Sequence, residues 1–295
     1  MKHKSIMKNF ITNYLINDTD GIYVDATFGQ GGHTKNILKI MKNSKLLIID
    51  KDYESITLAY KFSKIDKRIA INHDSYKNIK NIYYKNNITK NLSSIFLDLG
   101  ISSSQIDNHN RGFSFFNDGP LDMRMNITSK ITAYNWINTI NKKILNDTLK
   151  NFGEKQYKSI TENILKNRKI SKINTTKTLC NIIKNTNNKS NYDPNITFFA
   201  IRNTINNENN DLKIFFTDII NLLKNDGIII ILYFNSFEYN LLKHYINEIN
   251  ENETIENCYK LKKINLKKKI TYKEITNNIR ARSANIIILK KIKYK

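Results

Sequence analysis

Cysteine is nearly absent from this sequence, and long apolar runs are absent altogether. The 295 residues include two cysteines, Cys180 and Cys258, which lie far apart. Two cysteines exclude a disulfide scaffold and a cysteine-rich zinc site, and they fit a reducing compartment. We expect no metal site elsewhere in the sequence. No segment has the roughly 18 uncharged apolar residues that a membrane helix requires. Residues 1–10 contain lysines with no apolar core behind them, so we expect no signal peptide and a cytoplasmic protein.

Acidic residues are also few, and this imbalance has two interpretations. The chain has 26 Asp and Glu against 48 Lys and Arg, which gives a formal net charge of +22. A polyanionic partner, nucleic acid rather than membrane, would explain the excess. An AT-rich genome would explain it equally well, because the sequence is crowded with Lys, Asn and Ile. The charge alone therefore does not establish RNA binding.

The first hundred residues alternate short apolar runs with segments of helix length. Continuous apolar strands alternating with helices predict a parallel sheet that helices cover on both faces. The expected strands are Ile22–Asp25, Lys45–Asp50, 68–72 and 94–98, with a helix at 34–41 after the first.

The alternation stops near residue 107, and no convincing strand pattern follows until residue 194. Apolar residues at helical spacing predict an inserted helical domain with an ordinary core. The spacing is carried by Trp136, Ile137, Ile140, Ile144, Leu145, Leu149 and Phe152, with further helices expected at 160–165 and 179–183.

The last third returns to the first pattern. After a polar linker at 185–193 we expect a helix at 212–223, an Asp226-Gly227 turn, and strands at 228–234 and 284–289. The predicted fold is α/β, a sheet domain interrupted by a helical insertion domain. The predicted boundaries are 1–106 and 195–295 for the sheet domain and 107–194 for the insertion.

A glycine-rich loop joins the first expected strand to the first helix. It contains Asp25, Gly29, Gly31, Gly32 and His33. Glycines let the backbone approach a ligand closely, and the carboxyl end of a parallel strand is where α/β sheets bind nucleotides. The spacing does not suit a dinucleotide, whose third glycine is missing. An acidic residue before the loop favours a cationic ligand such as S-adenosylmethionine, although a turn without a ligand is a competing interpretation.

Two residues at the same sheet edge support a nucleoside site. Asp50 ends the second strand, where a carboxylate can accept hydrogen bonds from both ribose hydroxyls. Tyr76, after the third strand, could cover the adenine ring. The alternatives are that Asp50 caps the next helix and that Tyr76 is a packed aromatic.

The fourth strand ends at Asp98, which is the candidate catalytic residue. Methyl transfer to a ring-conjugated amine needs an acceptor that orients the NH2 group and balances developing positive charge. Asp98 could do this, bind the cofactor, or cap a helix, and a role beside the cofactor is the preferred one. The following loop has aromatics and arginines that could stack a base and hold phosphate, or could simply be packed. Its candidate residues are Arg111, Phe113, Phe115 and Arg124.

These motifs, in this order, resemble the bacterial ribosomal RNA small-subunit methyltransferase H family, also called MraW, over nearly the whole chain. The segments that carry the resemblance are 25–33, 49–52, 98–105, 111–115, 119–125, 152–154 and 280–284. The resemblance implies S-adenosylmethionine-dependent methylation of N4 of a decoding-centre (P-site) cytidine in 16S rRNA, within the small ribosomal subunit. The fold that it implies is a class I, Rossmann-like methyltransferase sheet with a helical insertion domain. The resemblance also implies cofactor contacts at Gly31, Gly32, His33, Asp50, Tyr76, Asp98 and Gln105. Arg280 and Arg282 join the expected substrate contacts.

The chain departs from the family pattern where RNA contacts are expected. The usual Ser-Phe-His-Ser-Leu-Glu-Asp-Arg run is replaced by Tyr233–Asn240, and Ile279 replaces a proline. The alternative hypothesis is therefore an RNA-binding or ribosome-assembly factor on a catalytically decayed fold. A small-molecule methyltransferase is a third hypothesis, which the net charge and the insertion disfavour.

Overall fold

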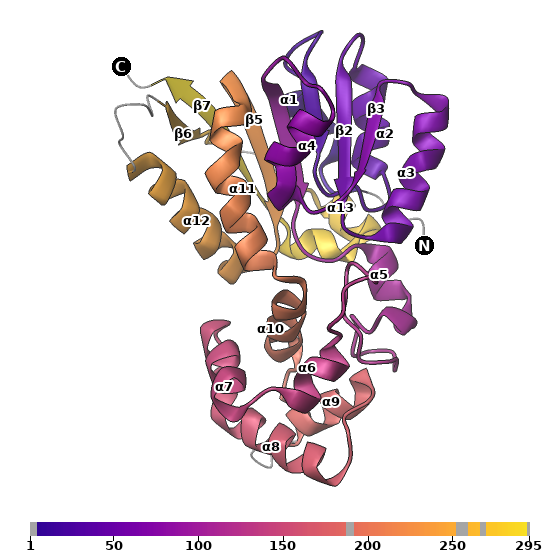
Figure 1. Ribbon diagram of the computed structural model, residues 1–295, viewed down its shortest axis with the longest axis vertical. Helices are drawn as coiled ribbons and strands as arrows, with labels where there is room; N and C mark the ends of the chain where they lie inside the picture. The colour runs from indigo at the N-terminus through magenta and orange to yellow at the C-terminus, as the bar shows by residue number, and fades with distance from the viewer. Residues whose placement is uncertain (1–4, 187–191, 252–258, 266–269, 294–295) are drawn as a thin grey trace. The chain divides into compact units, whose positions relative to one another are not determined.

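Two compact units make up the structure, a computed structural model that describes residues 5–186, 192–251, 259–265 and 270–293. Four of these residues, 273, 277, 279 and 280, are described by their backbone alone. One unit comprises Met1–Gly100 and Asn210–Lys295, and the other comprises Ile101–Asn209 (Figure 1). The helical unit therefore begins six residues earlier and ends fifteen residues later than the predicted insertion.

The first unit is built on a seven-stranded sheet whose order is β3-β2-β1-β4-β5-β7-β6 (Figure 1). All neighbouring strands are parallel except β7, which runs antiparallel to both β5 and β6. Val24 lies opposite Leu47 on one side and Ile95 on the other. This sheet confirms the predicted α/β class. The strands are β1 Ile22–Asp25, β2 Lys45–Asp50, β3 Ile69–His73, β4 Leu92–Asp98, β5 Leu223–Tyr233, β6 Tyr259–Lys263 and β7 Asn285–Lys293.

Successive residues of each central strand point to opposite faces, and both faces are buried. Val24 belongs to one apolar core with side chains of α4, α11 and α12, whereas Tyr23 belongs to a second core with α1, α2, α3 and η4. Burial on both faces explains why these strands read as continuous apolar runs. The helices are α1 Lys8–Leu15, α2 Gly32–Ile40, α3 Tyr53–Ile65, η1 Tyr76–Asn78, α4 Ile79–Lys85, α11 Glu208–Leu222, α12 Ser236–Glu251, α13 Tyr272–Asn277 and η4 Ile279–Ser283.

The turn expected at Asp226-Gly227 is instead an irregularity inside β5. The strand begins at Leu223 opposite Leu92, and its register against β4 shifts before Ile228 pairs with Ser94. Asp226 takes up the shift in a left-handed conformation with φ 63°. An Asp-Gly pair supplies such a conformation in a bulge as readily as in a turn, so the local signal was right and its context was wrong.

The second unit is helical, and its described residues contain only one isolated bridge, Pro120 to Thr175. The predicted stripe from Trp136 to Phe152 belongs to two helices, because α6 ends with Ile140 as its C-cap and Asn141 caps the start of α7. The core of this unit includes Phe198 of α10, so α10 belongs to the helical unit, whereas the predicted boundary placed it in the sheet domain. The helices are α5 Ser103–Asp107, η2 His109–Arg111, α6 Ala133–Thr139, α7 Lys142–Asn151, α8 Tyr157–Ile170, α9 Thr176–Lys184 and α10 Asn195–Asn206.

Candidate cofactor site and catalytic edge

The glycine loop between β1 and α2 has a conformation that only glycine adopts easily. Gly29 and Gly31 have φ of 52° and 70°. A Cβ at Gly31 would lie 2.6 Å from a ring carbon of Phe28, so a side chain has neither the backbone conformation nor the space. Gly31 is also the N-cap of α2, so the free N–H groups of that helix begin at this loop. The loop therefore brings backbone donors to the carboxyl edge of the sheet.

Asp25 accepts hydrogen bonds from both ends of this loop. Its Oδ2 accepts a hydrogen bond from Thr34 Oγ1 at 2.6 Å, and its Oδ1 accepts one from Thr27 N at 3.4 Å. The carboxylate is fully buried, and burial raises its pKa to about 6 although the Thr34 hydrogen bond opposes the shift. Asp25 thus shapes the loop from inside, and its predicted contact with a cofactor stays a prediction.

Asp50, at the end of β2, holds the middle of the glycine loop. Its Oδ2 accepts from Gly29 N at 2.8 Å, and its Oδ1 accepts from Asp52 N at 2.8 Å. Burial raises the pKa of Asp50 to about 6 against the effect of these hydrogen bonds. The cap of α3 is Asp52, whose side chain accepts from Glu54 N, so Asp50 does not serve as that helix cap. The structure therefore brings together the loop and the carboxylate that sequence spacing paired.

His33 lies in the first turn of α2 with an imidazole that is 7% exposed. Within the described residues neither Nδ1 nor Nε2 has a hydrogen-bond partner. The ring centroid is 4.5 Å from that of Phe96, and burial lowers the pKa of His33 to about 3, so the ring is neutral at pH 7. A buried polar group without a protein partner is a position where a bound water, ion or ligand can supply the hydrogen bond. The imidazole thus fits a site that is completed by a bound molecule.

Tyr76, shortly after β3, and Asp98, the last residue of β4, lie at the same edge of the sheet. The Tyr76 ring in η1 meets Phe215 of α11 edge to face, with centroids 5.8 Å apart. Asp98 ends β4 opposite Leu232, and its N–H donates to Thr27 Oγ1 at 2.6 Å. Thr27 therefore connects the glycine loop to the candidate catalytic residue. Sequence reasoning missed this role, since a threonine two residues beyond a strand is common in any loop.

Gln105 belongs to the helical unit, where it is buried in a capping box. Its Oε1 accepts from Ser102 N at 2.9 Å, and its own N–H donates to Ser102 Oγ at 3.3 Å. This arrangement fixes the start of α5. The predicted cofactor contact of Gln105 stays a prediction.

The arginines of the predicted substrate loop organise the loop itself. The guanidinium of Arg111 is buried and donates to the carbonyl oxygens of Arg124 and Met125, each at 3.0 Å. Arg124 binds Asp122 through two hydrogen bonds of 2.8 and 2.7 Å. These contacts give the loop a fixed shape, and the predicted contacts of both arginines with RNA stay predictions.

The exposed aromatic of this loop is Phe116. Phe113 is buried, and Phe115 packs edge to face on Phe198 with ring centroids 5.1 Å apart. Phe116 is 85% exposed, and its ring centroid lies 4.7 Å from that of Phe115. Of these three phenylalanines, Phe116 is therefore the one available to stack a base. In the sheet unit, Arg282 of η4 is exposed, whereas the side chain of Arg280 lies outside the described residues.

Comparisons with known proteins cover nearly the whole chain. Residues 1–292 match the MraW methylase family. A relative from Wigglesworthia glossinidia brevipalpis, named ribosomal RNA small subunit methyltransferase H, is 38% identical over 99% of this chain and 99% of its own length. One of the same name from Ruthia magnifica is 35% identical over 98% of each chain. A solved rRNA methylase from Streptococcus thermophilus is similar at a TM-score of 0.39 and 11% identity, covering 97% of this chain and 94% of that one. The chain belongs to the MraW methylase family.

Proposed function

We propose that this protein transfers a methyl group from S-adenosylmethionine to N4 of a decoding-centre cytidine, at the P site, in 16S rRNA of the small ribosomal subunit. The observation that carries the proposal is the hydrogen bond between Asp50 and Gly29 N, together with a buried His33 in the first turn of α2 that lacks a partner among the described residues. The names of the full-length relatives support the rRNA substrate. The resemblance described above supplies the cytidine N4 position.

The residues at the sheet edge fit S-adenosylmethionine. Asp50 can accept hydrogen bonds from the ribose hydroxyls, and Tyr76 offers a ring face for adenine. Gly31, as the N-cap of α2, brings the free N–H groups of that helix to the loop, and His33 has ring nitrogens available for a polar group of the ligand. Asp25 and Asp50 place negative charge where a cationic ligand needs it. When bound, the cofactor supplies an electrophilic methyl group on a sulfonium that leaves as a neutral thioether.

Asp98 is the residue that we assign to the reacting amine. It ends β4 next to Thr27 and the glycine loop. The cytidine N4 lone pair forms the new N–C bond while the C–S pair remains on sulfur, so the nitrogen becomes cationic and then loses one proton. A carboxylate at Asp98 can orient the NH2 group and balance that charge. The proton can pass to water, since an N-methylated cationic amine is acidic.

The two units have different roles in the proposed function. We assign cofactor binding to the sheet unit and RNA contacts to the helical unit, with its loop from Arg111 to Arg124 and the exposed Phe116. None of the helices in the described part of the chain is long and apolar enough to cross a membrane. The proposed partner is 16S rRNA within the small subunit, and the proposed location is the cytoplasm.

A decayed assembly factor is the alternative, motivated by the altered run at Tyr233–Asn240. In the structure this run is packed: the rings of Tyr233 and Tyr239 stack at 5.5 Å with an interplanar angle of 27°. The Oε2 atom of Glu238 accepts a hydrogen bond from Phe234 N at 2.7 Å. Because the two tyrosines replace residues of the family pattern and contact each other, we interpret them as a compensated change. The alternative is therefore not favoured.

The test of the proposed function is transfer of labelled methyl from S-adenosylmethionine to small ribosomal subunits that lack the modification. We expect labelled N4-methylcytidine at one decoding-centre position after digestion of the RNA. Free cytidine and fully modified subunits serve as negative substrates. Binding of S-adenosylhomocysteine without transfer would overturn the assigned substrate, and absence of both would favour the assembly factor.

Cofactor affinity should depend on pH through Asp50. The pKa of its carboxyl is raised to about 6 in the free protein, and ribose hydroxyls donate best to the ionised form. Binding therefore releases a proton below pH 6, so affinity must fall as the pH falls through this value. By calorimetry from pH 5 to 8 we expect a constant Kd for S-adenosylhomocysteine above pH 7. Below pH 6 the Kd should rise by up to about tenfold per pH unit. Asp50→Asn should bind weakly with a flatter profile, and an unchanged wild-type Kd at pH 5 would contradict the assignment.

A further inference from the structure

Four residues, which we call the Asp211 clamp, meet around a buried carboxylate in the sheet unit. The clamp consists of Asp211, Ser75, Lys51 and Lys77. The Asp211 side chain is 1% exposed, and its Oδ2 accepts a hydrogen bond from Ser75 Oγ at 2.6 Å. The ammonium of Lys51 forms an ion pair with the same carboxylate, and Lys77 Nζ lies 3.2 Å from Oδ1. Two positive groups and a hydroxyl thus converge on one buried carboxylate.

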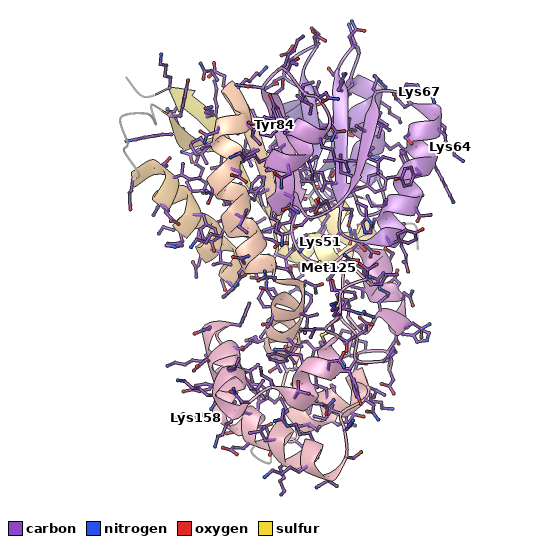
Figure 2. The ribbon with its side chains drawn as sticks, viewed as in Figure 1. Lys51, Lys64, Lys67, Tyr84, Met125 and Lys158 are labelled. Atoms are coloured by element: carbon purple, nitrogen blue, oxygen red, sulfur yellow. The ribbon has the colours of Figure 1, made fainter. Side chains whose placement is uncertain are left out.

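The partners of Asp211 stand next to the two residues that we assign to the nucleoside. Lys51, labelled in Figure 2, directly follows Asp50, and Ser75 directly precedes Tyr76. The clamp therefore holds the loop after β2 and the loop after β3 with a single side chain.

Two further contacts connect the same elements. Asp74 N donates to the carbonyl oxygen of Asp50 at 3.1 Å, so the loops are also joined by their backbones. Four residues after Asp211, about one turn along α11, Phe215 meets the Tyr76 ring edge to face. One face of α11 thus contacts both the residue before Tyr76 and Tyr76 itself.

The arrangement is better suited to fixing a geometry than to adding stability. Burying charges costs free energy that their attraction only partly repays, so a buried ion pair is weak evidence for stability. A charge-assisted network with several directed contacts does define the relative positions of its parts. Here the parts are the segments that carry Asp50 and Tyr76.

We infer that Asp211 is a positioning residue for the adenosine half of the cofactor, acting through Ser75 and Lys51. It sets the spacing between the carboxylate that accepts from the ribose and the ring that covers the adenine. The inference rests on the proposed cofactor placement. Asp211 itself touches neither the nucleoside nor the reacting atoms in this scheme.

Calorimetry with the full-length chain tests the inference, using S-adenosylhomocysteine and adenosine as separate probes. Asp211→Asn keeps the shape and removes the charge that attracts the lysines. We expect it to weaken binding of both probes by the same factor, about tenfold. In the methyl-transfer assay the KM for S-adenosylmethionine should rise while kcat at saturation changes less than twofold. Asp211→Glu should recover part of the affinity.

The matched control is Asp66→Asn, which removes a carboxylate paired with Arg68 at the other end of β3. It should leave both Kd values within twofold of wild type. If Asp211→Asn does not fold, Ser75→Ala removes a single hydrogen bond and should weaken both probes about threefold. A folded Asp211→Asn protein with unchanged Kd values, or a loss confined to S-adenosylhomocysteine, would overturn the inference. Failure of the wild type to bind either probe would instead count against the proposed cofactor site.

Discussion

Asp98→Asn should lower kcat for methyl transfer by about 10²- to 10³-fold, the size of loss seen when one preorganised charge-stabilising group is removed from an active site. The substitution keeps the shape of the side chain and the N–H that donates to Thr27 Oγ1. It removes the negative charge that we assign to the developing ammonium at N4. Single-turnover transfer to unmodified small subunits measures the chemical step directly. The Kd for S-adenosylhomocysteine, measured beside it, separates a role on the amine from a role on the cofactor.

Asp226→Asn is the matched control for Asp98→Asn. Asp226 also belongs to the sheet unit but lies near the start of β5, is 71% exposed and pairs with Lys290 at 2.8 Å. Asparagine tolerates its left-handed φ, so this variant should fold and retain kcat within twofold. If kcat of Asp98→Asn stays within tenfold of wild type, Asp98 is not the group that balances charge at the amine.

Gly31→Ala should abolish tight cofactor binding. The new Cβ would lie 2.6 Å from the Phe28 ring at a φ of 70°, so the loop must move away from its present path. The left-handed conformation costs a non-glycine residue about 1 to 2 kcal/mol, and the clash adds to this. Since every 1.4 kcal/mol is tenfold, we expect the Kd for S-adenosylhomocysteine to rise by about 100-fold. Calorimetry gives the Kd, and the melting temperature without ligand reports any general loss of stability.

Gly153→Ala separates backbone strain from the clash. Gly153 has a φ of 84°, but a Cβ there meets nothing within 4 Å. The variant should therefore show the cost of a left-handed alanine alone, as a lower melting temperature with an unchanged Kd. Gly31→Ala binding within threefold of wild type would show that the loop does not cradle the ligand.

The sheet was predictable from sequence because its strands are buried on both faces. Four apolar runs in the first hundred residues coincide with β1 to β4 to within two residues at each end. The domain boundary after α10 was not predictable, because an amphipathic segment shows that it packs but not against what. Phe198 and Ile201 have partners in the helical core, and no local pattern distinguishes that core from the sheet.

The site likewise contains residues that local sequence predicts and residues that it does not. Asp50 and the glycine loop could be paired from sequence, since the ends of adjacent parallel strands meet at one edge. Asp211 gave no signal, because its partner Ser75 is 136 residues away and an acid in a helix is usually solvated. Arg111 resembled a phosphate ligand by composition, yet burial directs its guanidinium to carbonyl oxygens of its own loop. Long-range contacts of this kind depend on the complete fold.

The pairing of β4 with β5 has a consequence for how the chain folds. These strands are neighbours in the centre of the sheet, yet the whole helical unit lies between them in the sequence. During synthesis, the first four strands emerge long before β5. The edge of β4 that pairs with β5 therefore has no hydrogen-bonding partner during this time. Such an edge invites pairing with other chains, and non-local contacts of this kind form slowly. The helical unit has a core of its own and can fold during this interval. The rate of translation through residues 99–222, between β4 and β5, thus sets how long the incomplete sheet remains open to aggregation.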